Sequence, residues 1–269
     1  MLIMGQTKKE ASNTYMNRSL TMLVYGESKV GKSTFAITAP YPRLMLDVEG
    51  GHRFLPINIK YWDPKVEAPP LADGTWDTCV VVVRDYDTVI EAYKYLNSGR
   101  HHFKSVILDS ISELQDKCIS DVAGTEQMKM QQWGEVLRIL GTFLRQLRDL
   151  TMHPTNPIQA VVITAMAKID DTTKRYKPYL QGQLQIQVPY LYDILGAIAI
   201  ESAPNQDVMK APIKSRRMYV ERTDKYEAGE RVQGRLGAII EQQNLSIETM
   251  INMIYPQQTE TPTQENGAN

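Results

Sequence analysis

Residues 26–34 read GESKVGKST and match the pattern G-x-x-x-x-G-K-[ST]. They follow an apolar run, TMLVY at 21–25, and precede a short helical stretch that Pro40 ends. The spacing has a physical reason, because glycines at its first and sixth positions let the backbone curl until successive N–H groups point into one concavity. A motif of this kind between a strand and a helix predicts a strand–loop–helix unit, which is the first step of an α/β fold.

Short apolar runs alternate with helical patterns along the rest of the chain. Several of the runs are almost continuously apolar, as expected for parallel strands that are buried on both faces. The strongest helical pattern covers 132–150, where Trp133, Val136 and four leucines fall on one stripe. This alternation predicts an α/β fold with a mainly parallel central sheet flanked by helices. The predicted strands after the first are 43–47, 78–84, 105–109, 159–165, 193–201 and 216–222.

The composition excludes several classes of protein. Hydrophobic residues make up 42% and charged residues 23% of the 269 residues, which argues against a disordered or collagen-like chain. The net charge of −1 gives no global basic field that would indicate nucleic acid. Cys79 and Cys118 are far apart, which disfavours a disulfide scaffold and a structural zinc site. No apolar run is long enough to cross a bilayer, so we expect a cytoplasmic protein without a membrane partner.

The chemistry of residues 26–34 points to a nucleoside triphosphate. Lys32 would neutralise the β- and γ-phosphates and the Ser33 hydroxyl would ligate Mg²⁺, so the expected cofactors are ATP and Mg²⁺. Thr34 can support the same turn. The alternative is a Gly-rich turn with an incidental lysine, which the strand before and the helix after disfavour. The residues predicted to bind the nucleotide are Gly26, Glu27, Ser28, Lys29, Val30, Gly31, Lys32, Ser33 and Thr34.

Two acidic residues at strand ends are candidates for the chemistry at the phosphates. Asp109 ends the run SVILD, where a second Mg²⁺-binding or water-ordering carboxylate belongs in such a sheet. Glu49 follows the strand 43–47 and is expected beside the phosphate loop, because successive strands tend to be neighbours. There it can orient or deprotonate the water that attacks the γ-phosphate, a role for which Asp47 competes. The alternative for each acid, taken alone, is an ordinary polar residue at the end of a strand with no role in chemistry.

Together, GESKVGKST, LMLDVEGG and VILDSISEL resemble in order and style the RecA-like recombinase ATPases. The resemblance is closest to small phage ATP-binding proteins that are reduced to a RecA core and act in single-strand annealing. It covers roughly residues 20–237 and implies a RecA-like P-loop NTPase fold. It also implies that Glu49 is the catalytic carboxylate and that Asp109, followed by Ser110 as in the family's usual pair, is the acidic strand-end residue. A phage-encoded protein of this kind would work in the host cytoplasm.

The resemblance also extends to the next strand and the segment after it. Thr164 is the polar candidate for sensing the γ-phosphate, whereas Met166 stands where a Gln or His is more usual. RecA-like proteins place DNA-facing loops after this strand, and here the stretch is basic with interleaved aromatic residues, which suits single-stranded DNA. A solvated loop with no ligand is the alternative. The DNA-binding candidates are Lys168, Lys174, Arg175, Tyr176, Lys177 and Tyr179.

A late segment, residues 218–237, resembles the part of the RecA core that reaches a neighbouring subunit's nucleotide. Arg222 and Lys225 are the candidates for cations that act across a subunit interface, and a charged edge hairpin is the alternative. From 208 to 235 the chain carries eight basic and four acidic residues, whereas 241–269 carries four glutamates and no basic residue. This asymmetry predicts a basic face and an acidic tail.

The sequence therefore predicts an ATPase that binds single-stranded DNA as a homo-oligomeric ring or filament and promotes strand annealing or exchange in homologous recombination. We expect hydrolysis to be DNA-stimulated, and a single-strand DNA-binding protein is a candidate partner. The alternatives are a nucleotide-binding assembly protein with little hydrolysis and a helicase or helicase loader. We divide the chain into a polar segment at 1–20, an ATPase domain at 21–240, and a short helix with a disordered acidic tail at 241–269.

Overall fold

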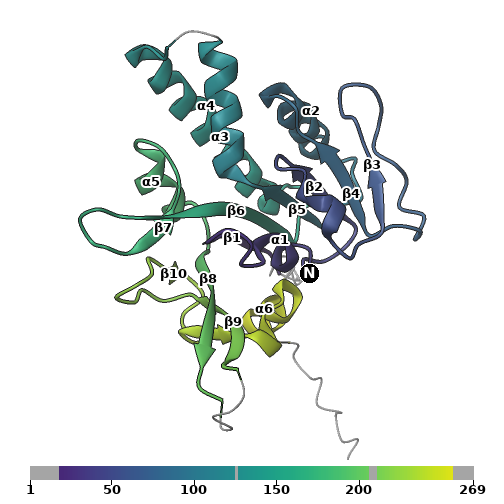
Figure 1. Cartoon of the computed structure of the whole chain (residues 1–269). Coiled ribbons are helices and arrows are strands. Elements are labelled where there is room, and N and C mark those ends of the chain that lie inside the picture. Colours follow the sequence, from purple (N-terminus) through teal and green to yellow (C-terminus); the bar gives the residue numbers. More distant parts are fainter. Residues whose placement is uncertain (1–17, 125–126, 206–210, 257–269) are drawn as a thin grey trace, which may run out of the picture.

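The computed structural model describes residues 18–124, 127–205 and 211–256 (Figure 1). The predicted α/β fold with a mainly parallel sheet is confirmed. The main path of the sheet runs β11-β9-β8-β1-β6-β5-β2-β4-β3, with β10 beside β8 and β7 beside β6. The strands are β1 (Leu20–Gly26), β2 (Arg43–Asp47), β3 (Ile59–Tyr61), β4 (Thr78–Val82), β5 (Ser105–Asp109), β6 (Ala160–Ile169), β7 (Tyr176–Pro178), β8 (Ile194–Ala203), β9 (Ile213–Tyr219), β10 (Gly229–Glu230) and β11 (Ile239–Glu241).

Helices cover both faces of this sheet (Figure 1). One face carries α2, α3 and α4, and the other carries α1 and α6. The α-helices are α1 (Lys32–Ala36), α2 (Tyr86–Asn97), α3 (Ile111–Ala123), α4 (Met130–Asp149), α5 (Leu184–Gln187) and α6 (Ile247–Ile254), and the 3-10 helices are η1 (Gly51–Phe54), η2 (Leu150–Met152), η3 (Val188–Tyr190) and η4 (Gln242–Asn244).

The order of the parallel strands decides which loops meet. Strands β8, β1, β6, β5, β2, β4 and β3 run parallel, so their carboxyl ends open on one edge of the sheet. The expectation that β2 lies beside β1 is wrong, because β6 and β5 lie between them. A strand's place in the sheet is set by tertiary pairing, and a tendency of successive strands to be neighbours does not determine it. Even so, the residues that follow β1, β2 and β5 reach the same edge.

The two hydrophobic cores follow from the alternation of side chains along the strands. In β1, Leu23 and Tyr25 face the core under α2, α3 and α4, whereas Met22 and Val24 face the core under α1 and α6. The predicted helix at 132–150 is present as α4, and its stripe Val136, Leu140, Leu144 and Leu147 is buried, while Trp133 is half-buried.

The C-terminal helix is part of the same folded unit as the sheet. Ile247, Met250 and Ile254 of α6 are buried in the core that contains α1 and β1, although the sequence-based boundary at 240 separates this helix from the domain. Residues 1–17 of the predicted N-terminal segment and residues 257–269 of the predicted tail lie outside the described residues.

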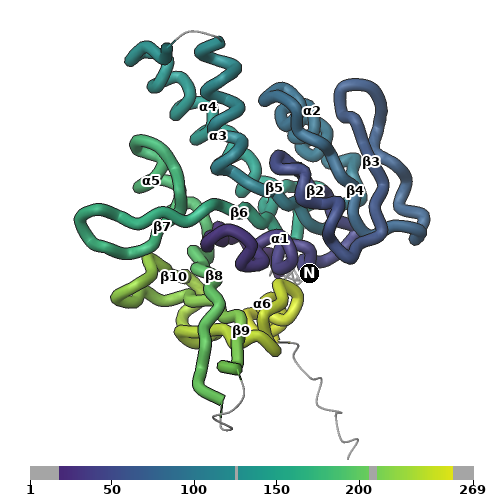
Figure 2. The backbone as a smooth tube through the Cα atoms, in the orientation of Figure 1, coloured from purple at the N-terminus to yellow at the C-terminus, as the bar shows by residue number. Residues whose placement is uncertain are grey.

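The short strands β3 and β7 are not among the strands predicted from the sequence. β3 extends the sheet beside β4, and Trp62 and Trp76 anchor the excursion between them in the core. Within 168–182, β7 pairs antiparallel with the end of β6, which makes a β6–β7 hairpin (Figure 2). Strands of three residues are too short to show a clear alternating pattern, so periodicity in the sequence does not reveal them.

Candidate active site

The phosphate loop, Gly26 to Thr34, connects β1 to α1 as the sequence predicts. Gly31 has a φ of 100° and caps the helix, and Lys29 also has a positive φ of 61°. The first N–H groups of a helix have no partner within the helix, and Gly31 has no side chain with which to accept from them. The turn therefore presents backbone donors to an anion, which fits the phosphates of a nucleotide.

Gly26 is a glycine because β8 passes very close to it. A Cβ atom at this position would lie 2.5 Å from the carbonyl oxygen of Ile198 and 2.9 Å from a methyl carbon of Val30. The first of these neighbours is backbone in a central strand, so it cannot rotate away. The start of the phosphate loop is thereby held against β8.

Replacing Gly26 with alanine should therefore destabilise the fold by about 1–3 kcal/mol, the usual range for forcing an extra carbon into a packed site. The matched control is Gly134→Ala in α4, where the added carbon meets nothing within 4 Å. That change should stabilise the protein by about 0.5–1 kcal/mol, because alanine is the better helix former. Urea denaturation measures the change in the free energy of unfolding for each variant, which should be a decrease for Gly26→Ala and an increase for Gly134→Ala. Equal changes would show that the contact with β8 is unimportant.

Lys32 begins α1 and folds back over the phosphate loop. Its Nζ donates to the carbonyl oxygens of Gly26 and Glu27, each at 3.0 Å. Burial lowers the pKa of Lys32, and the nearby carboxylates of Glu49 and Asp109 act in the opposite direction. The ammonium group therefore lies in the loop, within electrostatic reach of both predicted acids.

Asp109, the last residue of β5, lies next to Ser33 of the phosphate loop. The Ser33 hydroxyl donates to Asp109 Oδ2 at 2.6 Å, and the Thr164 hydroxyl donates to Oδ1. Asp109 is 2% exposed, and burial raises its pKa despite these two hydrogen bonds. A hydroxyl and a carboxylate are hard oxygen ligands, and a cation next to them would favour the charged carboxylate. The pair fits Mg²⁺.

Glu49 and Asp47 are the competing carboxylates at the end of β2, and they differ in accessibility. Asp47 is 1% exposed, and its Oδ1 accepts from the N–H group of Gly50 at 2.9 Å and, at 3.3 Å each, from those of Glu49 and Gly51. Its Oδ2 is bonded to the buried His52 ring. Asp47 is therefore the centre of the turn, whereas Glu49 is exposed at the edge.

Ser110 connects Glu49 to Asp109 in a way that the sequence did not reveal. The Ser110 hydroxyl donates to Glu49 Oε1, so the residue after the acidic strand end holds the other predicted acid. Ser110 also caps α3 by accepting from the N–H group of Glu113 at 3.3 Å. The Asp-Ser pair was visible in the sequence, but the partner of the serine was not.

Thr164 is buried beneath Asp109 and does not reach the surface. Its side chain is 0% exposed and its hydroxyl is bonded to Asp109, which places it to orient that carboxylate. Met166 is 38% exposed at the edge, and its N–H donates to the Ser112 hydroxyl at 3.0 Å. Sensing of the γ-phosphate by Thr164 stays a prediction.

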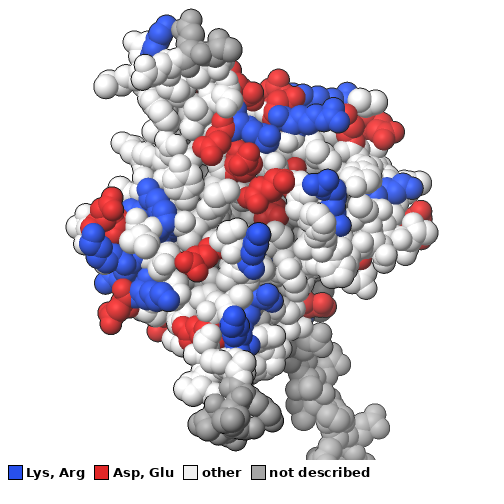
Figure 3. Space-filling model, in the orientation of Figure 1, with Lys and Arg blue, Asp and Glu red and all other residues white. Residues whose placement is uncertain are grey.

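The six predicted DNA-binding residues lie on or next to the β6–β7 hairpin, and several already have partners. Lys177 pairs with Asp170 within the hairpin, and Arg175 lies 3.7 Å from Glu227. Figure 3 shows this mixture of basic and acidic side chains over the hairpin, at the left of the view.

The other two basic residues of the hairpin are placed differently. The ammonium nitrogen of Lys168 lies 5.8 Å from the centre of the Tyr179 ring. Lys174 is exposed at the turn with a φ of 57°. The positive charge open to a ligand is thus smaller than the sequence suggests.

The hairpin is also hydrogen-bonded to the phosphate loop. The Tyr176 hydroxyl donates to Glu27 Oε1 at 3.2 Å. The hydroxyl of Tyr25, the residue before the loop, lies 2.8 Å from the carbonyl oxygen of Tyr176 and 2.7 Å from that of Glu227. Burial raises the pKa of Tyr25, so its hydroxyl remains a donor. Glu27 and Tyr176, which this contact joins, are 149 residues apart in the sequence.

Arg222 and Lys225, the predicted cations for a neighbouring subunit, lie beside the hairpin of their own chain. Arg222 Nε donates to Glu227 at 3.0 Å. The Lys225 ammonium lies over the rings of Tyr226 and Tyr176, at 5.1 and 6.0 Å from their centres. Their action across an interface stays a prediction.

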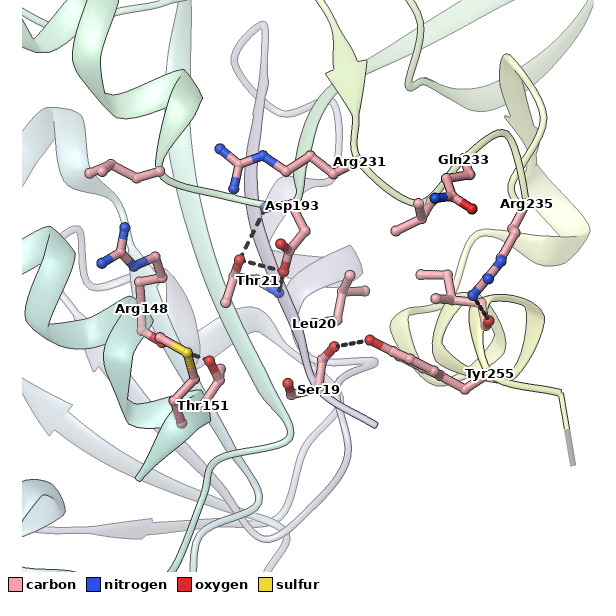
Figure 4. A pocket seen from close by; sticks show the side chains of 14 residues that line it. Ser19, Leu20, Thr21, Arg148, Thr151, Asp193, Arg231, Gln233, Arg235 and Tyr255 are labelled. Carbon is pink, nitrogen blue, oxygen red and sulfur yellow. Dashed lines mark hydrogen bonds between the residues drawn. The ribbon is translucent and has the colours of Figure 1, made fainter. Parts of the chain in front are cut away.

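A cavity of about 500 Å³ lies at the opposite edge of the sheet (Figure 4). It is lined near the start of β1 by Ser19 and Thr21, and Asp193 in its wall accepts from the N–H and hydroxyl groups of Thr21. No residue of the phosphate loop lines it. The candidate active site lies at the edge of the sheet where the parallel strands have their carboxyl ends, and this cavity is separate from it.

A family model described as an AAA domain matches residues 18–232. The match includes the phosphate loop, both strand-end acids and the β6–β7 hairpin. It supports a P-loop NTPase and does not identify a recombinase. No curated protein matches the chain. Among the described residues, no helix has the length and apolar character that crossing a membrane requires.

Proposed function

The chain belongs to the AAA domain family of P-loop NTPases, and on this basis we propose that it is an ATPase whose nucleotide state controls its binding of single-stranded DNA. The observation that carries the ATPase proposal is the meeting of Ser33, Asp109 and Glu49 at one edge of the sheet, joined by two hydrogen bonds through Ser33 and Ser110. These are the residue types that ATP hydrolysis requires at a phosphate loop.

Each residue has a separate part in the proposed reaction. Lys32 turns from the loop carbonyls to the β- and γ-phosphates and neutralises their charge. Ser33 and Asp109 hold Mg²⁺, which supplies further charge neutralisation on the same phosphates. Glu49 orients the attacking water and takes its proton, and Ser110 keeps this carboxylate directed toward the phosphates. Thr164 is a positioning residue that acts through Asp109.

Coupling to DNA is supported by the contact between the phosphate loop and the hairpin. Tyr25 and Glu27 lie on either side of Gly26, and both are bonded to Tyr176. A change in the loop on nucleotide binding would break or strengthen these bonds and so change the hairpin that Lys168 and Lys174 belong to. Nucleotide then shifts the protein between two states of different DNA affinity. We further propose that a homo-oligomer uses this switch to promote strand annealing or exchange in homologous recombination, as the resemblance to RecA-like proteins implies.

Lys168 and Lys174 are the two basic residues of the hairpin that have no carboxylate partner in the described part of the chain, and the DNA part of the proposal predicts that removing them weakens binding. The double variant Lys168→Ala, Lys174→Ala should lose about tenfold or more in affinity for single-stranded DNA in the presence of ATP. The slope of log affinity against log salt is negative, and the loss of two phosphate contacts should make it shallower by about 1.4. Fluorescence anisotropy with a labelled oligonucleotide over a salt series measures both.

The matched control for that experiment removes two charges elsewhere, with Lys60→Ala and Lys104→Ala, both exposed and outside the hairpin. It should leave affinity and slope unchanged. Equal affinities and equal slopes for the hairpin variant and the control would mean that DNA binds elsewhere or not at all.

A nucleotide-binding assembly protein with little hydrolysis is the second candidate function, and one observation favours it. Met166, exposed at the edge of the site, offers no polar side chain to the γ-phosphate, and Thr164 is buried. ATP would then hold subunits together without turnover. Steady-state phosphate release separates the two candidates, because only the ATPase proposal requires it.

A further inference from the structure

Arg216 of β9 contacts the phosphate loop, although it lies far from the loop in the sequence and two strands away from β1. Its Nε donates to the carbonyl oxygen of Val30 at 2.7 Å. Its backbone N–H donates to Gln242 Oε1 at 3.0 Å, which ties this part of β9 to η4. We infer that Arg216 is a phosphate-binding residue that β9 contributes to the nucleotide site of the same chain. This inference rests on the proposed nucleotide binding.

The guanidinium group lies against the glycine that caps α1. A Cβ atom on Gly31 would lie 2.7 Å from both Nε and Cζ of Arg216 and 2.8 Å from Nη2. Glycine is required at this position by its φ of 100° as well as by the arginine. Arg216 thus reaches the turn whose backbone donors are expected to hold the phosphates.

The charge of Arg216 is not balanced by a carboxylate among the described residues. The next residue differs in this respect, because Arg217 is paired with Glu201 at 3.0 Å and with Glu241 at 2.9 Å. Arg216 is half-buried, so its charge is partly removed from water. An anion bound beside this partly desolvated guanidinium would supply the opposite charge that the described carboxylates do not.

An arginine has donors to spare for this role. A guanidinium carries five N–H donors in a fixed fork, and the bond to Val30 uses the one on Nε. The two Nη groups can donate to phosphate oxygens, for which the planar fork is well suited. Lys32 comes to the phosphates from the start of α1, and Arg216 comes from the strand beyond β8. The ligand class is a nucleoside di- or triphosphate.

The test measures nucleotide affinity by calorimetry for the full chain with Mg²⁺ and either ATP or ADP. Arg216→Gln keeps a donor for the Val30 carbonyl but removes the charge, so it separates phosphate binding from support of the loop. We expect it to bind ATP and ADP at least tenfold more weakly than the unmodified protein, and its affinity to depend less on salt. Arg216→Lys, which keeps the charge, should bind more tightly than Arg216→Gln. Lys214→Ala is the matched control, because it removes a charge from the same face of β9.

Thermal unfolding without nucleotide completes the test. The Tm of Arg216→Gln should equal that of Lys214→Ala within a few degrees, which shows that the loss of affinity is not a loss of fold. Arg216→Gln binding ATP and ADP as tightly as the unmodified protein would overturn the inference and leave the arginine a support for the loop. If the unmodified protein binds neither nucleotide, the proposed function itself fails, which is a distinguishable result.

Discussion

At an ATP concentration that only just saturates the unmodified protein, replacing Lys32 with alanine is expected to remove most of the effect of ATP on the binding of single-stranded DNA. The ammonium group is the only side-chain cation that α1 brings to the phosphate loop. Its loss removes a charge-assisted contact to the phosphates, which is worth about 1.5–3 kcal/mol, or roughly 10- to 150-fold in ATP affinity. Without bound nucleotide the loop cannot act on Tyr176, so the hairpin remains in one state.

Calorimetry measures the loss of ATP affinity, and anisotropy with a labelled oligonucleotide measures the loss of the ATP effect. Lys104→Ala is the control, because Lys104 is exposed and precedes β5, at the opposite edge of the sheet. It should behave as the unmodified protein. A Lys32→Ala variant whose DNA affinity responds to ATP over the same concentrations as the unmodified protein would show that the coupling does not run through the phosphate loop.

The second large effect is expected at Glu49. Glu49→Gln keeps the size of the side chain and can still accept from Ser110, but it cannot take a proton from water. General-base catalysis typically contributes about 10²–10⁴-fold to a rate, so phosphate release should fall by about that factor while ATP affinity changes little. Measuring steady-state turnover and ATP binding on the same preparation separates the two.

Two further variants sharpen this result. Glu67→Gln, in the exposed excursion after β3, removes one carboxylate at a distance and should leave turnover unchanged. Asp47→Asn should reduce stability, because Asp47 holds the turn through N–H groups of Glu49, Gly50 and Gly51. If Asp47→Asn folds normally and loses turnover whereas Glu49→Gln retains it, the roles of the two acids are reversed.

Much of the site was predictable because parallel strands share an edge. The motif at 26–34 and the acids that follow two apolar runs could be placed at the carboxyl ends of strands from sequence alone. The order of the strands was not predictable, since β6 and β5 separate β1 from β2 through pairings between distant segments. The reasoning that put Glu49 beside the loop was therefore wrong, although Glu49 reaches the same edge.

Side-chain partners were the other feature that could not be predicted. The hairpin looks strongly basic as a sequence, but Lys177 and Arg175 face Asp170 and Glu227, and Glu227 is more than fifty residues away. The contact of Arg216 with Gly31 has no signal in the sequence, because it depends on how β9 passes beside β8. Long-range contacts of this kind are set by the packed structure and not by local pattern.

The most direct test of the proposed function is the steady-state rate of ATP hydrolysis by the full chain with Mg²⁺, measured with and without single-stranded DNA. We expect measurable turnover that increases when single-stranded DNA is added. Absence of turnover under both conditions would contradict the ATPase proposal, and turnover that DNA leaves unchanged would contradict the coupling of the phosphate loop to the hairpin.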